Sequence, residues 1–435
     1  MAKFPRILAL PIAAIFIVGA CGSSNTGGSG GTGGTTGATI TVTSLWGGSE
    51  QESFQKVLDE FKAKTGNTAT YDAQRTDYAT VLQSKITSGA PPDVAIMPGL
   101  GFLRQFARTK GIKSIKELGL DPAALEANYP AGILDSGKVD GELYGIMVKF
   151  NSKSTFWYRP DTLQTAGAST PKSWDDLKSL ITTLQGKGTA TPLALGAKDS
   201  WTLTDWFEEI YLRQNGPDAY KKLFSPDGNW TDPTVSKALD AMKEVLTDKN
   251  VPGGIKGALG VAFTDGIAQA FGENPTAALY YEGGFVGGIA TGQTNKNLKI
   301  GTSIDWFGFP TFGGSGDTAA EIGGDEIAAL TTKPGVKEFI QFMTTADAGS
   351  TWAKTGAIIS PVKAVGADSY PNDLAKKEAA QVAGASAVVY DGSDTLPAGS
   401  PDMGAMLQDV IQGKDAAGLL STFNTGVQKA WADEK

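Results

Sequence analysis

A strand, a turn and a helix follow one another within residues 39–61, which read TITVTSLWGGSEQESFQKVLDEF. The segment Thr39–Trp46 alternates and is rich in β-branched side chains, which is typical of a strand. A glycine pair then predicts a turn, and the pattern Ser49-x-x-Glu52 predicts a capping box at the start of a helix. The apolar residues of that helix share one face, as expected for a helix that covers a sheet: Phe54, Val57, Leu58 and Phe61.

The same alternation of strands and helices continues along the chain, which predicts an α/β fold. Strands are predicted at residues 68–73, 93–97, 143–148, 155–158, 276–281, 300–309 and 327–330. Helices are predicted at residues 76–88, 234–246 and 336–343, after Ser173, and in the tail from about residue 404. We find no fixed-period repeat.

The composition excludes several classes of function. The 435 residues include no histidine and one cysteine, and the formal net charge is −8. Without histidine there is no Ser-His-Asp triad and no imidazole metal ligand. A single cysteine excludes an internal disulfide and a thiolate zinc site. An acidic chain argues against a nucleic-acid partner, so carboxylate chemistry, carboxylate–metal chemistry and binding without chemistry remain.

The N-terminus has the features of an export signal. Lys3 and Arg6 precede an uncharged run at residues 7–20, which is too short to span a membrane but typical of a signal peptide, predicted here for residues 1–20. Gly19 and Ala20 before Cys21 resemble the lipobox of bacterial lipoproteins. This resemblance implies a lipid on Cys21; the alternative is a plain signal peptide with a chance cysteine.

Residues 22–38 read GSSNTGGSGGTGGTTGA and contain no charged or large side chain. Such a sequence predicts a flexible tether with a reach of roughly 23 Å. With a lipid on Cys21, the segment 21–38 would hold an exported domain close to the outer face of the cytoplasmic membrane.

Beyond the opening block, the order and spacing of several motifs resemble one family, the extracellular solute-binding proteins of ABC sugar importers, which include maltose-binding protein. The motifs are Gly89-Ala-Pro-Pro-Asp93-Val, Leu143-Tyr-Gly-Ile, Trp157-Tyr158, Pro171-x-Ser-Trp174-Asp-Asp-Leu, Tyr281-Glu-Gly-Gly-Phe285 and Pro310-Thr-Phe. Three further stretches resemble the α-glucoside branch: EIGGDEIAAL at 321–330, WAKTGAIISP at 352–361 and DGSDTLP at 391–397. The resemblance covers residues 39–435.

The resemblance implies a two-lobed periplasmic-binding-protein-like fold, in which each lobe is a sheet flanked by helices and the ligand lies in the cleft between them. Lobe 1 would comprise residues 39–149 and 311–355, and lobe 2 residues 150–310 and 356–435. The chain would cross between lobes near Lys149–Asn151 and Phe309–Thr311.

The resemblance also implies the function. The protein would be a monomeric, lipid-anchored, substrate-binding component of an ABC importer, with no catalytic residue, metal or cofactor. It would capture an oligosaccharide or other small sugar, such as an α-glucoside, by hinge closure and deliver it to the membrane subunits of a permease.

A sugar is held by aromatic rings against its C–H faces and by polar side chains that bond its hydroxyls. In α/β lobes such residues are expected at the carboxyl ends of strands. Trp201, Asp205 and Trp206 form the best local cluster, and Glu282 with Phe285 follows a predicted strand beside two glycines. The complete set of predicted ligand-binding residues is Trp46, Ser49, Glu50, Arg75, Asp93, Trp157, Trp201, Asp205, Trp206, Glu282, Phe285 and Asp325.

These residues also have purely structural interpretations. Trp46 and Trp157 fit a hydrophobic core, and Ser49 fits a simple helix cap. Arg75 fits a surface ion pair with a nearby aspartate, and Asp93 fits a structural turn. The cluster around Trp201 equally fits a packed helix. We interpret Trp230, Trp306 and Trp352 as structural.

Three other functions compete with sugar transport. An exported glycosidase needs two carboxyl groups about 5–10 Å apart, and Glu282 with Asp325 is the pair to consider. A binding protein for a polyol, polyamine or peptide would share the fold. A surface adhesin would share only the membrane anchor.

Overall fold

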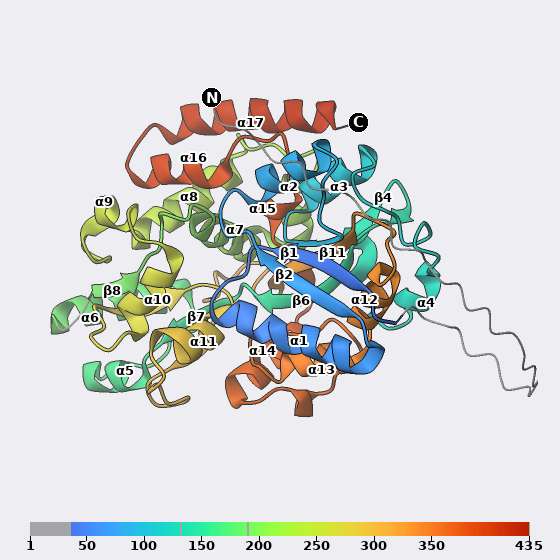
Figure 1. Cartoon of the computed structure of the whole chain (residues 1–435). Helices are drawn as coiled ribbons and strands as arrows, with labels where there is room; N and C mark the ends of the chain where they lie inside the picture. Colours follow the sequence, from blue (N-terminus) through green and yellow to red (C-terminus); the bar gives the residue numbers. More distant parts are fainter. Residues whose placement is uncertain (1–35, 131–132, 189–190, 435) are drawn as a thin grey trace, which may run out of the picture. The chain divides into compact units, whose positions relative to one another are not determined.

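The computed structural model describes residues 36–130, 133–188 and 191–434 (Figure 1). The strands are β1 Thr39–Ser44, β2 Thr68–Ala73, β3 Val94–Met97, β4 Lys138–Val139, β5 Glu142–Leu143, β6 Ile146–Ser152, β7 Thr155–Tyr158, β8 Thr191–Ala194, β9 Ala277–Tyr281, β10 Asp305–Gly308, β11 Ala320–Ala329 and β12 Val388–Tyr390. The predicted signal peptide, Cys21 and the tether up to residue 35 lie outside the described residues.

The helices alternate with these strands along the chain. They are α1 Ser49–Thr65, α2 Tyr78–Thr87, α3 Leu100–Arg108, α4 Pro122–Glu126, α5 Pro160–Ala166, α6 Trp174–Lys187, α7 Trp201–Leu223, α8 Pro233–Val245, α9 Gly254–Ala258, α10 Phe263–Phe271, α11 Phe285–Ile289, α12 Val336–Met343, α13 Ala346–Ala353, α14 Asp373–Ala383, α15 Gly392–Thr395, α16 Met403–Ile411 and α17 Ala416–Asp433. Three short helical segments that are not α-helical complete the set: η1 Ile133–Gly137, η2 Ala290–Thr294 and η3 Ala367–Ser369.

The larger sheet has the strand order β12-β11-β3-β1-β2, and β6 also pairs with β11. Strand β1 is parallel to β2 and β3, whereas β11 runs antiparallel to β3 and β6. Both faces of this sheet are covered. Val94 and Ile96 of β3 pack in one hydrophobic cluster with α1, while Ala95 and Met97 pack in another with α3. This division follows the two-residue period of a strand and explains why β3 is apolar throughout.

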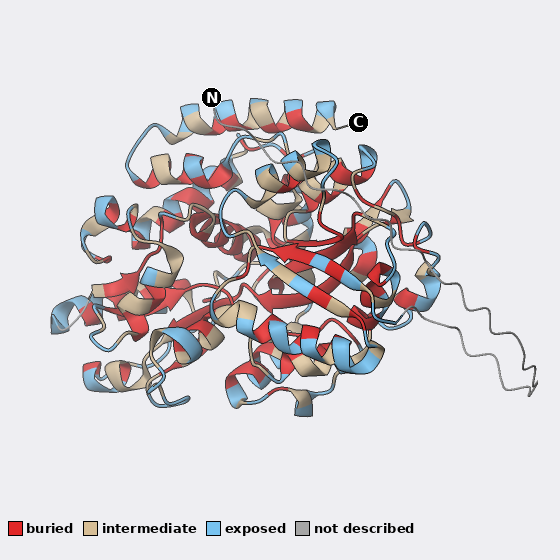
Figure 2. Cartoon of the chain, viewed as in Figure 1, coloured by how far each residue is buried: buried red, intermediate tan, exposed pale blue. Residues whose placement is uncertain are grey.

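The second sheet has the order β10-β7-β9-β8 and is also buried on both faces. Phe156 of β7 and Tyr281 of β9 belong to one cluster, and their neighbours Trp157 and Tyr280 belong to another. Figure 2 shows buried residues concentrated in the strands, with exposed residues on the outer sides of helices such as α1 and α17. The predicted α/β class is therefore confirmed.

Two short segments lead from one sheet to the other. Strand β6 of the larger sheet is followed after two residues by β7 of the second sheet, and β10 is followed by β11. Ile358 and Ile359 pack in the same cluster as Ile40 of β1 and Phe54 of α1, on one face of the larger sheet. The boundaries of the two lobes stay a prediction.

The structure corrects three local expectations. Helix α1 has Gly48 as its N-cap with no side-chain cap bond, so the predicted capping box at Ser49 is wrong. The strand predicted at residues 300–309 is confined to β10, because Gly301 has a φ of 75° and the chain turns there. The strand predicted at 327–330 begins earlier, at Ala320.

No helix in the described part of the chain combines the length and the apolar character that a membrane crossing requires.

Candidate functional site

A row of three polar side chains on one face of the chain at β6 forms the floor of a pocket. Lys149, Asn151 and Lys153 alternate with residues of the opposite face, as the period of a strand requires. All three line a pocket with a volume of about 690 Å³. The chain passes from the larger sheet to the second sheet at this point, so the pocket is bordered by elements of both.

Lys149 organises the wall of the pocket formed by the larger sheet. Its Nζ lies 3.0 Å from Oδ2 of Asp325, and the two residues are opposite each other in the β6–β11 register. The same Nζ lies 4.8 Å from the ring centroid of Trp46, a cation–π distance, and 3.9 Å from Oε1 of Glu50. Burial raises the pKa of Glu50, and Lys149 acts in the opposite direction.

Lys153 organises the wall formed by the second sheet. Its Nζ lies 5.0 Å from the ring centroid of Trp201 and 5.8 Å from that of Phe285. The two rings are 6.0 Å apart in an edge-on arrangement. The pocket therefore has an aromatic ring with a lysine against it on each side, Trp46 on one and Trp201 with Phe285 on the other.

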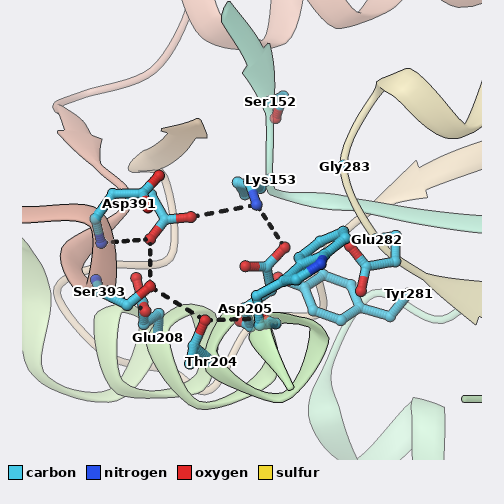
Figure 3. A network of polar contacts seen from close by, with 12 residues as sticks. Ser152, Lys153, Thr204, Asp205, Glu208, Tyr281, Glu282, Gly283, Asp391 and Ser393 are labelled. Atoms are coloured by element: carbon cyan, nitrogen blue, oxygen red, sulfur yellow. Dashed lines mark hydrogen bonds and ion pairs between the residues drawn. The ribbon is translucent and has the colours of Figure 1, made fainter. Parts of the chain in front are cut away.

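Two carboxylates, those of Asp205 and Asp391, hold the Lys153 ammonium group (Figure 3). Nζ lies 2.7 Å from Oδ2 of Asp205 and 3.2 Å from Oδ2 of Asp391. Burial acts to lower the pKa of Lys153, but the neighbouring carboxylates, Asp205 first, raise it well above its ordinary value. Burial raises the pKa of Asp205 to about 6, against the lowering effect of Lys153.

Half of the twelve residues predicted from the sequence line this pocket: Trp46, Glu50, Arg75, Trp201, Phe285 and Asp325. Ser49 lines an adjacent hollow of about 210 Å³ together with Glu50 and Phe285. That any of these side chains contacts a ligand stays a prediction.

Three of the remaining predicted residues lie directly behind the pocket. Asp205 is 1% exposed and supports Lys153. Glu282 is fully buried, and burial followed by the neighbouring Asp205 raises its pKa well above the ordinary value. Trp157 donates its indole N–H to the carbonyl oxygens of Glu282 and Gly283, which fixes the loop that carries Phe285.

The last two predicted residues lie away from the pocket lining. Trp206 packs in the core against the rings of Phe156 and Tyr281. Asp93 joins β1 to the chain after β11, because it accepts hydrogen bonds from Thr41 and Thr331. The structural interpretation of Asp93 fits these contacts.

Sequence reasoning missed the three floor residues, as well as Asp391 and Ser393, which also line the pocket. A signal for the floor residues was available in the alternation of Lys149, Asn151 and Lys153 at the expected crossing between lobes. The stretch DGSDTLP at 391–397 was recognised as a motif, but none of its residues was predicted to bind a ligand.

The comparisons with known proteins agree on one family. The sequence profile of the bacterial extracellular solute-binding proteins matches residues 47–350. Osmoprotective compounds-binding protein GgtB from Synechocystis sp. is 28% identical over 399 residues, which cover 90% of this chain and 92% of that protein. Alpha-glucosides-binding periplasmic protein AglE from Rhizobium meliloti is 28% identical over 410 residues, which cover 90% and 87%.

Solved structures confirm the fold. The bacterial solute receptor AcbH superposes with a TM-score of 0.77 at 23% identity, covering 91% of this chain and 98% of that one. A chitin oligosaccharide binding protein superposes with a TM-score of 0.76 at 20% identity, covering 91% of this chain and 99% of that one. The predicted two-lobed periplasmic-binding-protein-like fold is thereby confirmed.

Proposed function

The chain belongs to the bacterial extracellular solute-binding protein family, and from this premise we propose that its 690 Å³ pocket captures an uncharged sugar. Two further relatives are named as extracellular-binding proteins of ABC transporters. A pocket of this size is in the range of sites that enclose a small molecule.

The observation that carries the proposal is that both floor lysines already form ion pairs within the protein. Lys149 is already paired with Asp325, and Lys153 is paired with Asp205 and Asp391. Because the cations are neutralised within the protein, these pairs need no charged group from the solute. They present fixed donors and acceptors for hydroxyl groups, next to aromatic rings suited to the C–H faces of a sugar.

The relatives indicate the class of sugar. AglE is named for α-glucosides and GgtB for osmoprotective compounds, and each aligns with nine-tenths of this chain. We therefore propose an α-glucoside or another oligosaccharide as the solute.

Capture would proceed by closure of the two lobes. A solute that touches Trp46 on one side and Trp201 on the other stabilises the closed form, because only that form makes both sets of contacts. The segment between β6 and β7 and the segment between β10 and β11 would act as hinges. The closed form would then deliver the sugar to the permease subunits.

Calorimetric titration of the purified chain with maltose, trehalose and sucrose tests this function. One sugar is expected to bind, and it should raise the thermal unfolding midpoint, since a ligand at a hundredfold excess over Kd stabilises the folded state by about 2.7 kcal/mol. Replacing Trp201 by alanine should weaken binding by about 1–3 kcal/mol.

Trp431→Ala is the matched control, because Trp431 is a half-buried tryptophan that packs against Arg104 outside the pocket. Equal affinities in the two variants would remove Trp201 from the site. Failure of every sugar in the panel would leave the family assignment in place and exclude the tested sugar class.

The lining also supports a second candidate, a polyamine. Five carboxyl groups line the pocket, at residues 50, 199, 325, 391 and 394, against three cations, at residues 75, 149 and 153. Spermidine and putrescine therefore belong in the same titration. Binding of an amine with no response to sugars would replace the sugar proposal.

We also propose that Cys21 carries a lipid that holds the protein at the outer face of the cytoplasmic membrane. The Cys21→Ala variant should then appear in the soluble fraction after cell disruption, while the unchanged protein stays with membranes. A membrane-bound variant would contradict the anchor.

A further inference from the structure

Three carboxyl groups from distant parts of the chain meet in the interior behind the sugar pocket. Asp205 lies on α7, Glu321 on β11, and Asp391 at the junction between β12 and α15. Each offers an oxygen that lies within 4.8 Å of the others, and all three residues are buried. The backbone holds two of them in place. The N–H of Asp391 donates a hydrogen bond to the carbonyl oxygen of Ile322, and the N–H of Glu321 donates one to the hydroxyl oxygen of Ser154.

Glu321 is the unexplained member of this group. It is fully buried, and neither of its carboxyl oxygens has a hydrogen-bond partner. Within residues 36–130, 133–188 and 191–434, no ion pair joins it to a lysine or arginine. Burying a carboxylate without a partner is costly. A buried carboxylate that lies beside two others and lacks a partner of its own indicates that a ligand binds between the three groups.

The cations nearby are already committed to other oxygens. Lys153 bonds Oδ2 of Asp205 and pairs with Oδ2 of Asp391, which leaves Oδ1 of Asp205 buried and without a partner. Arg213 pairs with Glu209 and donates to three backbone carbonyls. A second buried oxygen without a partner, Oε2 of Glu209, adds to the negative charge around Glu321.

The charge balance therefore favours an added cation. Six buried carboxyl groups lie in this region, at residues 205, 208, 209, 282, 321 and 391, against the two cations Lys153 and Arg213. Burial, followed by the carboxyl groups of Glu208 and Glu209, raises the pKa of Glu321 well above its ordinary value. The cluster thus accepts either a proton or a metal ion, and the two are distinguishable by experiment.

We propose that Asp205, Glu321 and Asp391 form a structural site for a divalent cation of the calcium class. Ca²⁺ binds carboxylate oxygens at 2.3–2.6 Å, so ligand oxygens on its opposite sides lie about 4.6–5.2 Å apart. Mg²⁺ needs shorter bonds of 2.0–2.1 Å in a strict octahedron. Glu321 has both oxygens free and is suited to bidentate coordination, with water completing the shell.

Because of its position, a cation at this site would hold several elements of the fold together. It joins β11 of the larger sheet to α7, which packs with the second sheet, and to the start of α15. Lys153 and Asp391 border both the cation site and the sugar pocket. The cation would therefore stabilise the floor of the pocket without touching the solute, and its binding does not depend on the identity of that solute.

Direct metal measurement on the purified full chain tests the site. After passage over a chelating resin and re-equilibration with Ca²⁺, mass spectrometry is expected to find one calcium ion per chain. Tb³⁺ should give luminescence sensitised by Tyr281, whose hydroxyl donates to the Asp205 carbonyl 3.1 Å away, and Ca²⁺ should displace it. Saturating Ca²⁺ should raise the unfolding midpoint by about 3 °C.

Glu321→Gln should abolish the sensitised emission and the thermal shift. Glu326→Gln is the matched control, because Glu326 is an equally buried carboxyl group of the same strand that is bonded to Ser136. Both responses should persist in that control. Circular dichroism checks that each variant folds, and Asp205→Asn replaces Glu321→Gln if the latter does not.

Absence of stoichiometric calcium and of sensitised emission in the unchanged protein would overturn the proposal and assign a proton to Glu321. Emission of equal strength in the Glu321→Gln variant would also overturn it, because the ion would then be bound elsewhere.

Discussion

Replacing Glu378 by glutamine tests how burial of a carboxyl group under the pocket floor affects stability. Glu378 lies on α14 and is 4% exposed. Its Oε1 accepts hydrogen bonds from the backbone N–H of Ser152 at 2.9 Å and from the side-chain amide of Asn151 at 3.2 Å. Because Asn151 lines the pocket, Glu378 is a positioning residue for the floor.

The expected magnitude follows from the pKa of this group. Burial raises the pKa of Glu378 from 4.5 to about 7, although the two hydrogen bonds act to lower it. The folded state therefore holds the proton more tightly than the unfolded state. The resulting stabilisation is fully present below pH 4.5 and is lost as the pH rises to 7. At about 1.4 kcal/mol per pKa unit, the loss is about 3 kcal/mol.

Glutamine keeps an acceptor oxygen and stays neutral at every pH. Relative to the unchanged protein, Glu378→Gln should therefore gain about 3 kcal/mol of unfolding free energy between pH 4.5 and pH 8. Urea unfolding followed by tryptophan fluorescence at pH 4.5, 6 and 8 measures this difference.

The control is Asp373→Asn, which removes an exposed carboxyl group from the same helix. Its unfolding is measured at the same three pH values and gives the effect of removing a carboxyl group from this helix outside the pocket floor. Parallel stability curves for Glu378→Gln and the unchanged protein would refute the reasoning, since they would show that Glu378 binds no additional proton on folding.

Two further substitutions test the contact between α3 and the C-terminal elements. A Cβ added at Gly101 would lie 2.0 Å from the carbonyl oxygen of Leu396, so Gly101→Ala should lower the free energy of unfolding in urea by roughly 1–3 kcal/mol. A Cβ at Gly366 meets no atom within 4 Å, so Gly366→Ala should lower it far less. Equal losses of unfolding free energy in the two glycine variants would contradict the close packing of α3 against Leu396. Arg104→Met removes an ion pair of 2.6 Å to Glu434 and should speed hydrogen exchange in the last turn of α17 by about tenfold, equivalent to about 1.4 kcal/mol. Unchanged exchange would show that this pair does not hold the helix end.

Local patterns predicted much of the fold and part of the site. The strand, turn and helix of residues 39–61 and the helix Val336–Met343 follow from side-chain periodicity alone. Trp46 and Phe285 were predictable as pocket residues, because each lies next to a strand end or a glycine-rich turn and aromatic side chains suit a sugar. Trp201 was predictable from its helical spacing with Asp205 and its proximity to Trp206. These signals are confined to a few neighbouring residues.

The only local signal for the charged floor of the pocket is the alternation of Lys149, Asn151 and Lys153, and alternation does not show that the lysines are buried. Lysines within a strand fit a solvent-exposed face, yet Lys149 and Lys153 are only 7% exposed. Their burial depends on Asp325, Asp205 and Asp391, which come from other elements far along the chain. Sequence periodicity does not report such pairings, because it describes one element at a time.

The glycines of β11 explain why the strand beside this floor was predicted too short. Gly323 and Gly324 interrupt the apolar pattern, and glycine in a strand usually weakens it. In the structure, a Cβ at Gly323 would lie 2.5 Å from Cε of Lys153, and one at Gly324 would lie 3.0 Å from the carbonyl oxygen of Lys149. The glycines are therefore needed for the close approach of the chain that carries both lysines. Since the next residue, Asp325, pairs with Lys149, the part of the strand with the weakest local signal is the part that builds the pocket.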